Sequence, residues 1–283
     1  MTKIVACIDG SLYAESVCDH AAWAAGRLGL AVDLVHALGR RETASQPFDL
    51  SGTLDLGERE ALLAELADLD EKKSKVAARR GRLVLAQAAE RLNRAGVAVE
   101  QHLRHGDVAD AVSAMETEAR LVVIGKRGEA ADFARGHLGS NLERVIRSTP
   151  LPVLVASRAF REIRRFMVAF DGGRSAMAIV ERLAASPLLA ETSCELFMAG
   201  EPSGEAGERL HLAERRLREA GYAASVRIAE GDADEVIARR VEAGGIDLIV
   251  MGAYGHSRIR HLIVGSTTTR LIQSCAIPVL VVR

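Results

Sequence analysis

The chain has 283 residues, a length that suggests about two domains. Its formal net charge is −1, so composition points to no nucleic-acid or anionic-membrane partner. No apolar run approaches the ~20 residues that span a bilayer, and the N-terminus enters a predicted strand without a signal-peptide pattern. Four widely spaced cysteines (Cys7, Cys18, Cys194 and Cys275) form no Cys-x-x-Cys pair, which argues against a disulfide framework or zinc site. We therefore expect a cytoplasmic protein.

Short apolar runs alternate with amphipathic stretches through the first half of the chain. Strands are predicted at 3–8, 32–38, 97–104, 121–124 and 152–155, and helices at 12–29, 59–95, 107–119 and 142–148. The stretch 59–95 is charged and rich in leucine, which predicts one long helix or two. Its charges are interpreted as a solvated helix face, with a partner-binding helix as the alternative.

The same order of elements repeats after a short polar linker at 157–162. Strands are predicted at 165–170, 193–199, 224–229, 246–251 and 277–282, and helices at 175–185, 207–220, 233–243 and 267–274. Each half begins with a strand followed by Asp-Gly and ends in Pro-Val-Leu-Val, which indicates a duplicated domain with boundaries at 1–158 and 162–283. Strands alternating with helices predict an α/β fold, with right-handed βαβ units and a parallel sheet covered on both faces.

A glycine-punctuated loop joins the fourth strand of the second half to its last helix. The spacing there is Gly252, two residues, Gly255, nine residues, then Gly265-Ser266-Thr267. Glycine allows close backbone approach to a ligand, and a helix start offers N–H groups and a positive dipole end to an anion such as phosphate. The whole spacing resembles the ATP-binding signature of the universal stress protein family.

The resemblance implies two tandem Rossmann-like domains of the adenine nucleotide alpha hydrolase-like type, each a five-stranded parallel sheet of order 3-2-1-4-5. It also implies a cytoplasmic stress-response protein that binds ATP, with Mg²⁺. Family members commonly pair their fifth strands between domains across a pseudo-twofold axis. Because an exposed apolar edge is normally covered or paired, we expect the fifth strands of the two halves to pair antiparallel within this chain. Further homodimerisation through other surfaces stays open, and so does a protein partner.

In such sheets ligands bind at the carboxyl ends of the strands, where the strand order reverses. This places Asp171, just past strand one, beside Gly252, just past strand four; the Asp171 carboxylate suits a ribose hydroxyl or a metal-bound phosphate, or caps the next helix. By family position, Ala199 offers its backbone to the adenine and Met251 an apolar contact. The nucleotide-binding residues expected in this half are Asp171, Ala199, Met251, Gly252, Gly255, Gly265, Ser266 and Thr267.

The first half carries the matching positions with two departures. Ten residues, not nine, separate Gly128 from Gly139, and Asn141 replaces the threonine. The matching positions are Asp9, Ala37, Gly125, Gly128, Gly139 and Ser140. Four further residues, Lys126, Arg127, Arg135 and His137, either hold phosphates or form a solvated surface. We expect tighter ATP binding in the second half, where the spacing is intact.

Other catalytic and metal-binding patterns are missing from the sequence. It contains neither a Gly-x-x-x-x-Gly-Lys-Ser/Thr loop nor a Gly-x-Ser-x-Gly elbow, and its histidines lack a zinc spacing. No catalytic or metal residue is therefore predicted. A nucleotide-dependent regulator is the leading hypothesis; a slow ATPase or adenylate-handling enzyme, and a nucleotide-free interaction scaffold, are the alternatives.

Overall fold

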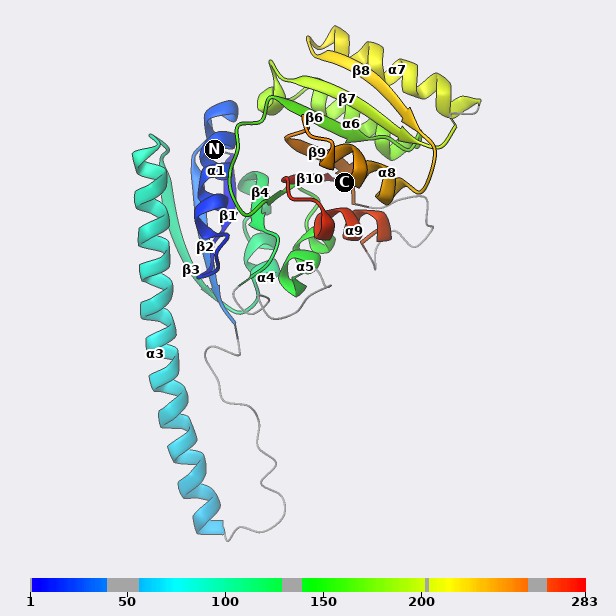
Figure 1. The fold of residues 1–283 in the computed structure, drawn as a ribbon. Helices are drawn as coiled ribbons and strands as arrows, with labels where there is room; N and C mark the ends of the chain where they lie inside the picture. Colours follow the sequence, from blue (N-terminus) through cyan, green and yellow to red (C-terminus); the bar gives the residue numbers. More distant parts are fainter. Residues whose placement is uncertain (1, 40–55, 129–138, 202–203, 254–263) are drawn as a thin grey trace.

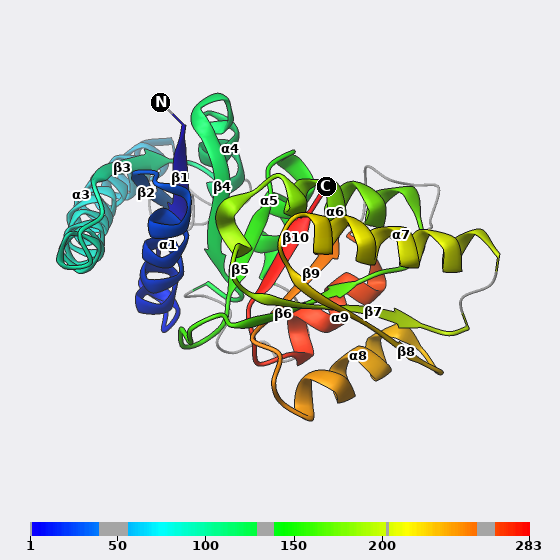
Figure 2. The ribbon, with the colours of Figure 1, turned by 90° about the horizontal axis from the view of Figure 1, so that it is seen from above.

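The structure is a computed structural model, and it describes residues 2–39, 56–128, 139–201, 204–253 and 264–283. Ten strands form one sheet in the order β3-β2-β1-β4-β5-β10-β9-β6-β7-β8, with β3 and β8 at its opposite ends (Figures 1 and 2). The strands of the first half are β1 (Lys3–Cys7), β2 (Val32–Leu38), β3 (Val99–His105), β4 (Ala119–Gly125) and β5 (Val153–Ala156). Those of the second half are β6 (Arg165–Ala169), β7 (Ser193–Ala199), β8 (Ala223–Ala229), β9 (Leu248–Gly252) and β10 (Val279–Val282).

The pairing within each half is parallel and follows the predicted order 3-2-1-4-5, so the predicted fold class is confirmed. The central strands β1 and β4 are buried on both sides, with Ile4, Val5, Val122 and Val123 almost inaccessible. Continuous apolar runs of this kind are typical of parallel sheets that helices cover on both faces.

Two helical layers bury two apolar clusters against the faces of the sheet. One layer contains α1 (Ala14–Leu28), α3 (Leu56–Arg94), α6 (Arg174–Ala184) and α7 (Glu205–Glu219). The other contains α4 (Val108–Ser113), α5 (Ser140–Ser148), α8 (Ala233–Glu242) and α9 (Ser266–Ser274). Short 3₁₀ turns lie at Glu116–Glu118 and Pro187–Leu189. None of the described helices is long and apolar enough to cross a membrane.

Two boundaries differ informatively from the sequence prediction. The helix expected at 107–119 ends at Ser113, because Ala119 already pairs with Lys3 in the sheet and the 3₁₀ turn makes the connection. For residues 59–95 the sequence allowed one long helix or two, and the structure has a single helix there, α3, of 39 residues. The C-terminal part of α3 packs on the sheet through Leu85 and Leu92.

The two halves meet along β5 and β10, which pair antiparallel as expected. Val279 lies opposite Val155, Leu280 opposite Leu154, and Val281 opposite Val153. Both apolar clusters continue across this seam, since each contains residues of both halves. The edge that each half would expose on its own is therefore the centre of a continuous sheet.

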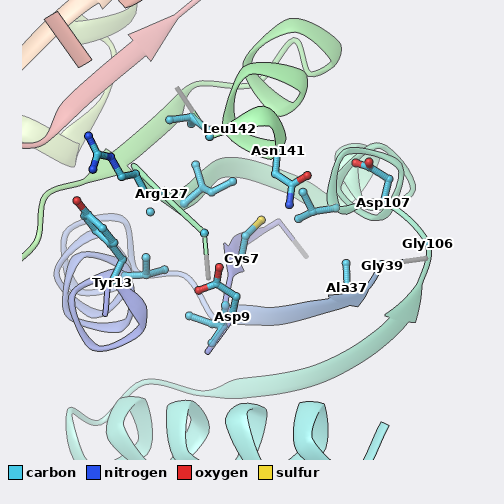
Figure 3. A pocket seen from close by; sticks show the side chains of 17 residues that line it. Cys7, Asp9, Tyr13, Ala37, Gly39, Gly106, Asp107, Arg127, Asn141 and Leu142 are labelled. Carbon is cyan, nitrogen blue, oxygen red and sulfur yellow. The ribbon is translucent and has the colours of Figure 1, made fainter. Parts of the chain in front are cut away.

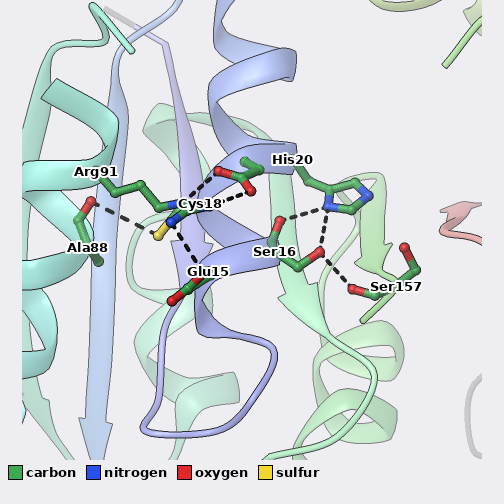
Figure 4. A network of polar contacts seen from close by, with 8 residues as sticks. Glu15, Ser16, Cys18, His20, Ala88, Arg91 and Ser157 are labelled. Atoms are coloured by element: carbon green, nitrogen blue, oxygen red, sulfur yellow. Dashed lines mark hydrogen bonds and ion pairs between the residues drawn. The ribbon is translucent and has the colours of Figure 1, made fainter. Parts of the chain in front are cut away.

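The linker that the sequence presents as polar is anchored at its first residue. Ser157 is buried, and its carbonyl accepts a hydrogen bond of 2.7 Å from the Ser16 hydroxyl of α1. His20, one turn further along α1, meets the ring of Phe160 edge-on. On the other side of α1, the Arg91 guanidinium of α3 makes a two-pronged ion pair with Asp19, at 2.7 and 2.8 Å (Figure 4). Helix α1 thus connects α3 to the linker.

Candidate functional site

A cavity of about 470 Å³ opens at the carboxyl ends of β6 and β9, where the strand order of the second half reverses. Every predicted residue of this half that the structure describes lines it, namely Asp171, Ala199, Met251, Gly252, Gly265, Ser266 and Thr267. Gly255 lies outside the described residues. Residues far apart in sequence are therefore brought together as the topology predicts.

The turn after β6 fixes the Asp171 carboxylate at the mouth of this cavity. Its Oδ1 accepts a hydrogen bond of 2.8 Å from the backbone N–H of Gly173, ahead of α6. Gly172 has a φ of 72°, and a Cβ there would lie 2.7 Å from Cβ of Ala206. Arg209 of α7 donates to the Gly172 carbonyl at 2.7 Å. Only glycine fits this turn without strain.

Apolar side chains that belong to no sequence motif form the walls of the cavity. They are Phe170, Phe197, Ile179 and Ile237. Met251 is buried beside them. In sequence, these residues have the periodicity of ordinary core, and only the topology shows that they face a cavity. An apolar wall next to polar groups at a helix start suits a ligand with a flat apolar part and an anionic part.

The start of α9 is held against the end of β9. The Gly265 N–H donates to the Ala253 carbonyl at 3.0 Å, and the Thr268 hydroxyl to the Gly252 carbonyl at 2.9 Å. Gly265 is the N-cap and provides no side-chain cap. The first N–H groups of a helix have no acceptor within it, so the first turn of α9 presents donors and hydroxyls to the cavity.

The first half has a smaller cavity, of about 140 Å³, at the equivalent place. Of its predicted residues, Asp9, Ala37, Gly125, Gly128 and Gly139 line the cavity. Ser140 is exposed and is not among the lining residues, whereas Asn141 is. Arg127 and Tyr13 lie on one side of this cavity, and Asn141 and Asp107 on the other (Figure 3).

Two glycines of the first half leave little room for a side chain. A Cβ on Gly125 would lie 2.8 Å from Cβ of Tyr13, and one on Gly128 would lie 3.0 Å from Oδ2 of Asp9. The loop after β4 therefore packs closely on the loop after β1. The Oδ1 atom of Asp9 also accepts a hydrogen bond from Ser11 N–H at 3.0 Å, so this carboxylate helps to organise both loops.

The two basic residues after Gly125 have different positions. Arg127 lines the cavity, but Lys126 is buried and donates a hydrogen bond to the carbonyl of Cys275, just past α9 in the other half. The sequence suggested that Lys126 either holds a phosphate or belongs to a solvated surface. In the structure it does neither. Arg135 and His137 lie outside the described residues.

Asp107 also lines the first cavity and was not predicted. Its Oδ1 caps α4 by accepting from Ala109 N–H at 2.8 Å, and its other oxygen pairs with Arg144 of α5. A sequence signal for this position exists: Gly106-Asp107 follows the third strand of the first half, and Gly231-Asp232 follows the third strand of the second. The next residue in each half, Val108 or Ala233, lines the corresponding cavity.

Comparison with known proteins places the chain in a family. The sequence profile of the Universal stress protein family matches residues 1–157 and 162–283. A universal stress protein of Synechocystis sp. is 39% identical over 287 residues, with all of both chains covered. A universal stress protein structure from Archaeoglobus fulgidus superposes with a TM-score of 0.69 at 19% identity, covering 99% of this chain and 98% of that one. A putative universal stress protein from Pseudomonas aeruginosa gives 0.64 at 16% identity, covering 100% and 93%. The chain belongs to the universal stress protein family and carries two of its domains in tandem.

Proposed function

We propose that this protein binds ATP, with Mg²⁺, in the cavity of the second half, more tightly than at any site of the first half, and that it acts as a cytoplasmic nucleotide-dependent regulator in the stress response. The observation that carries the proposal is the second cavity. There a carboxylate at a strand end, an apolar wall and an uncapped helix start converge on about 470 Å³. That volume is in the range of small-molecule sites.

The residues of the second cavity fit the three parts of an adenine nucleotide. The adenine would lie against Phe170 and Phe197, near the backbone of Ala199 at the end of β7. Asp171 would accept from a ribose hydroxyl, or contact a metal-bound phosphate. The phosphates would lie at the start of α9, where backbone N–H groups and the hydroxyls of Ser266 and Thr267 are available donors.

A contact between the halves supports the regulatory part of the proposal. Helix α9 starts at the second cavity and ends at Cys275, whose carbonyl accepts the hydrogen bond from Lys126. Lys126 lies between Gly125 and Arg127, two residues that line the first cavity. A ligand that stabilises one position of α9 would therefore also act on the loop of the first half.

A pair of matched acidic substitutions tests the proposal by calorimetry. Thr267→Glu and Asn141→Glu occupy the same position in the first turns of α9 and α5. A glutamate at a helix start favours the helix dipole, so both variants should fold, but its charge repels phosphate. We expect Thr267→Glu to remove the tighter ATP site, with an affinity loss of roughly tenfold or more, and Asn141→Glu to affect only the weaker one.

Three outcomes would contradict the proposal or part of it. Absence of ATP binding to the wild-type chain would refute it. Loss of the tighter site in Asn141→Glu alone would show that the halves are reversed. A larger melting shift with NAD than with ATP at equal concentration would overturn the nucleotide assignment, because the chain lacks the dinucleotide fingerprint. Steady ATP hydrolysis that disappears in Asp171→Asn would favour the enzyme alternative.

A further inference from the structure

Helix α3 extends well beyond the sheet on which its C-terminal part packs (Figure 1). Its 39 residues give a length of about 58 Å at 1.5 Å per residue, more than twice that of a seven-residue strand such as β3. The base of α3 is fixed by burial of Leu85 and Leu92 and by the ion pair of Arg91 with Asp19 (Figure 4). The direction in which the remainder projects is therefore set by packing.

An apolar stripe runs along the outward side of α3 at intervals of seven residues, from the projecting part to the part that packs on the sheet. It consists of Leu62, Leu69, Val76 and Leu83. Three of these side chains are exposed, Leu69 by 44%, Val76 by 68% and Leu83 by 60%. The stripe does not face the sheet, because that side of the helix carries Leu85 and Leu92. A seven-residue repeat keeps such a stripe in contact with a second helix that winds around the first.

The charges on the same segment are separated into two blocks. Residues 59–71 contain five acidic residues and one arginine, whereas residues 72–82 contain six basic residues and no acidic one. The helix dipole does not account for this, because its effect is confined to the first and last turns. The Glu71–Lys75 ion pair at 2.6 Å lies at the boundary between the blocks and leaves most of each block beside like charge.

The stripe and the charge blocks share one centre of symmetry. About a point between Lys72 and Lys73, Leu62 is as far from the centre as Leu83, and Leu69 as far as Val76. A second α3 placed antiparallel on this centre would set these apolar residues opposite one another. It would also lay the acidic block of each helix along the basic block of the other. A parallel partner would place like charges together, so the sequence is complementary to itself in the antiparallel orientation alone.

We propose that α3 is a homodimerisation arm, on which a second copy of this chain docks its own α3 antiparallel along the stripe Leu62, Leu69, Val76 and Leu83. Such an interface is isologous, as in most homodimers, because each copy offers the same surface. It is separate from the seam at β5 and β10, which is satisfied within one chain. Two nucleotide-binding bodies would then lie at opposite ends of a helical pair.

Sedimentation equilibrium of the full-length chain tests the interface. We expect the wild type to dimerise, and the double variant Leu69→Glu/Val76→Glu to raise the dimer dissociation constant by roughly tenfold or more, since four carboxylates would face one another at the centre of the interface. Glutamate favours helices, so circular dichroism should show α3 intact. Leu212→Glu is the matched control, because Leu212 is a 40% exposed leucine on α7, and it should dimerise like the wild type. A monomeric wild type, or a double variant that dimerises as well as the wild type, would overturn the proposal.

Cysteine cross-linking tests the orientation. The four native cysteines are all buried, so introduced thiols at exposed positions should react selectively. Leu62→Cys/Leu83→Cys in one chain should give a disulfide-linked dimer under mild oxidation, whereas each single variant should not. An internal bridge is impossible, because the two positions are about 31 Å apart along the helix. Efficient cross-linking by Leu62→Cys alone would indicate a parallel pair and contradict the antiparallel arrangement.

Discussion

A buried lysine joins the loop of the first cavity to the far end of the helix that starts at the second cavity. Lys126 follows a glycine of the first cavity and donates to the Cys275 carbonyl beyond α9. Burial lowers the pKa of Lys126 to about 8; the nearby Cys275 raises this pKa, and Arg127 lowers it. Below pH 8 the folded protein therefore keeps the charged Lys126 amine in a buried position, which costs free energy. In the unfolded chain the same amine is solvated.

This lysine predicts a pH dependence of stability. Between pH 8 and 10.5 the unfolded chain binds more protons at Lys126 than the folded chain does, so the free energy of unfolding rises with pH. From pH 7.5 to 9.5 we expect the wild type to gain about 2 kcal/mol relative to Lys126→Met. Urea titrations of both proteins at the two pH values measure this difference. The effects of Cys7, Cys18 and Cys194, whose pKa values Lys126 does not influence, cancel in it.

Lys3→Met provides the control for that measurement. Hydrogen bonds to Glu100 and Asp33 raise the pKa of Lys3, so this amine stays protonated in both states over the whole window. Its removal should shift stability by a similar amount at pH 7.5 and 9.5. If the free energy of unfolding of Lys126→Met also changes by the same amount as that of the wild type between pH 7.5 and 9.5, the Lys126 amine does not titrate in this range.

Two glycines inside helices differ in the space that a side chain would have. Gly81 lies in α3 where the helix crosses the sheet, and a Cβ there would come within 2.7 Å of His36 Cδ2 and of Leu103 Cδ1. His36 cannot yield freely, since it is buried and its Nδ1 is bonded to the Ile8 carbonyl at 2.8 Å. Gly26 of α1 is exposed, and a Cβ there would have nothing within 4 Å.

The same substitution should therefore have opposite effects at these positions. Gly26→Ala should stabilise the protein by up to about 1 kcal/mol through helix propensity. Gly81→Ala should destabilise it by about 1–3 kcal/mol, because overpacking exceeds the same propensity gain. The free energies of unfolding of the two variants, measured by chemical denaturation, test these opposite effects. A stabilised Gly81→Ala would mean that α3 lies further from β2 and β3 than the structure shows.

The elements that the sequence predicted well are those whose signal is local. Strand and helix periodicity located all ten strands to within a few residues, because a buried parallel strand reads as a short apolar run between turns. The glycine spacing likewise pointed to Gly252 and Gly265, which both line the second cavity, because the loop that carries this spacing is a continuous segment.

Contacts between distant segments could not be read in this way. Lys126 looks like a phosphate ligand in sequence, and its partner Cys275 lies 149 positions away. Phe170 and Phe197 look like ordinary core residues until the sheet places them beside Asp171. In each case the deciding information is which loops the strand order brings together, and this depends on the whole topology.

The seam between β5 and β10 makes the two halves one body. Leu154 and Leu280 lie opposite each other in the sheet and belong to the same apolar cluster as Val17 of α1 and Leu210 of α7. Arg283 reinforces the seam by donating to the carbonyls of Arg147 and Thr149, both at 3.0 Å. Neither half can unfold without exposing a sheet edge and part of a shared core in the other.

This continuity predicts that damage to the core of one half is felt in the other. Leu210 is 1% exposed on α7, far along the chain from the first half, and Leu210→Ala should cost about 2–5 kcal/mol. If unfolding is cooperative across the seam, the slowest-exchanging amides of β1 and β4 should lose as much protection as those of β6 and β9. Hydrogen exchange resolved to these strands measures the effect. Unchanged protection in β1 and β4, with loss confined to β6 and β9, would show that the halves unfold separately and that pairing of β5 with β10 contributes little to their coupling.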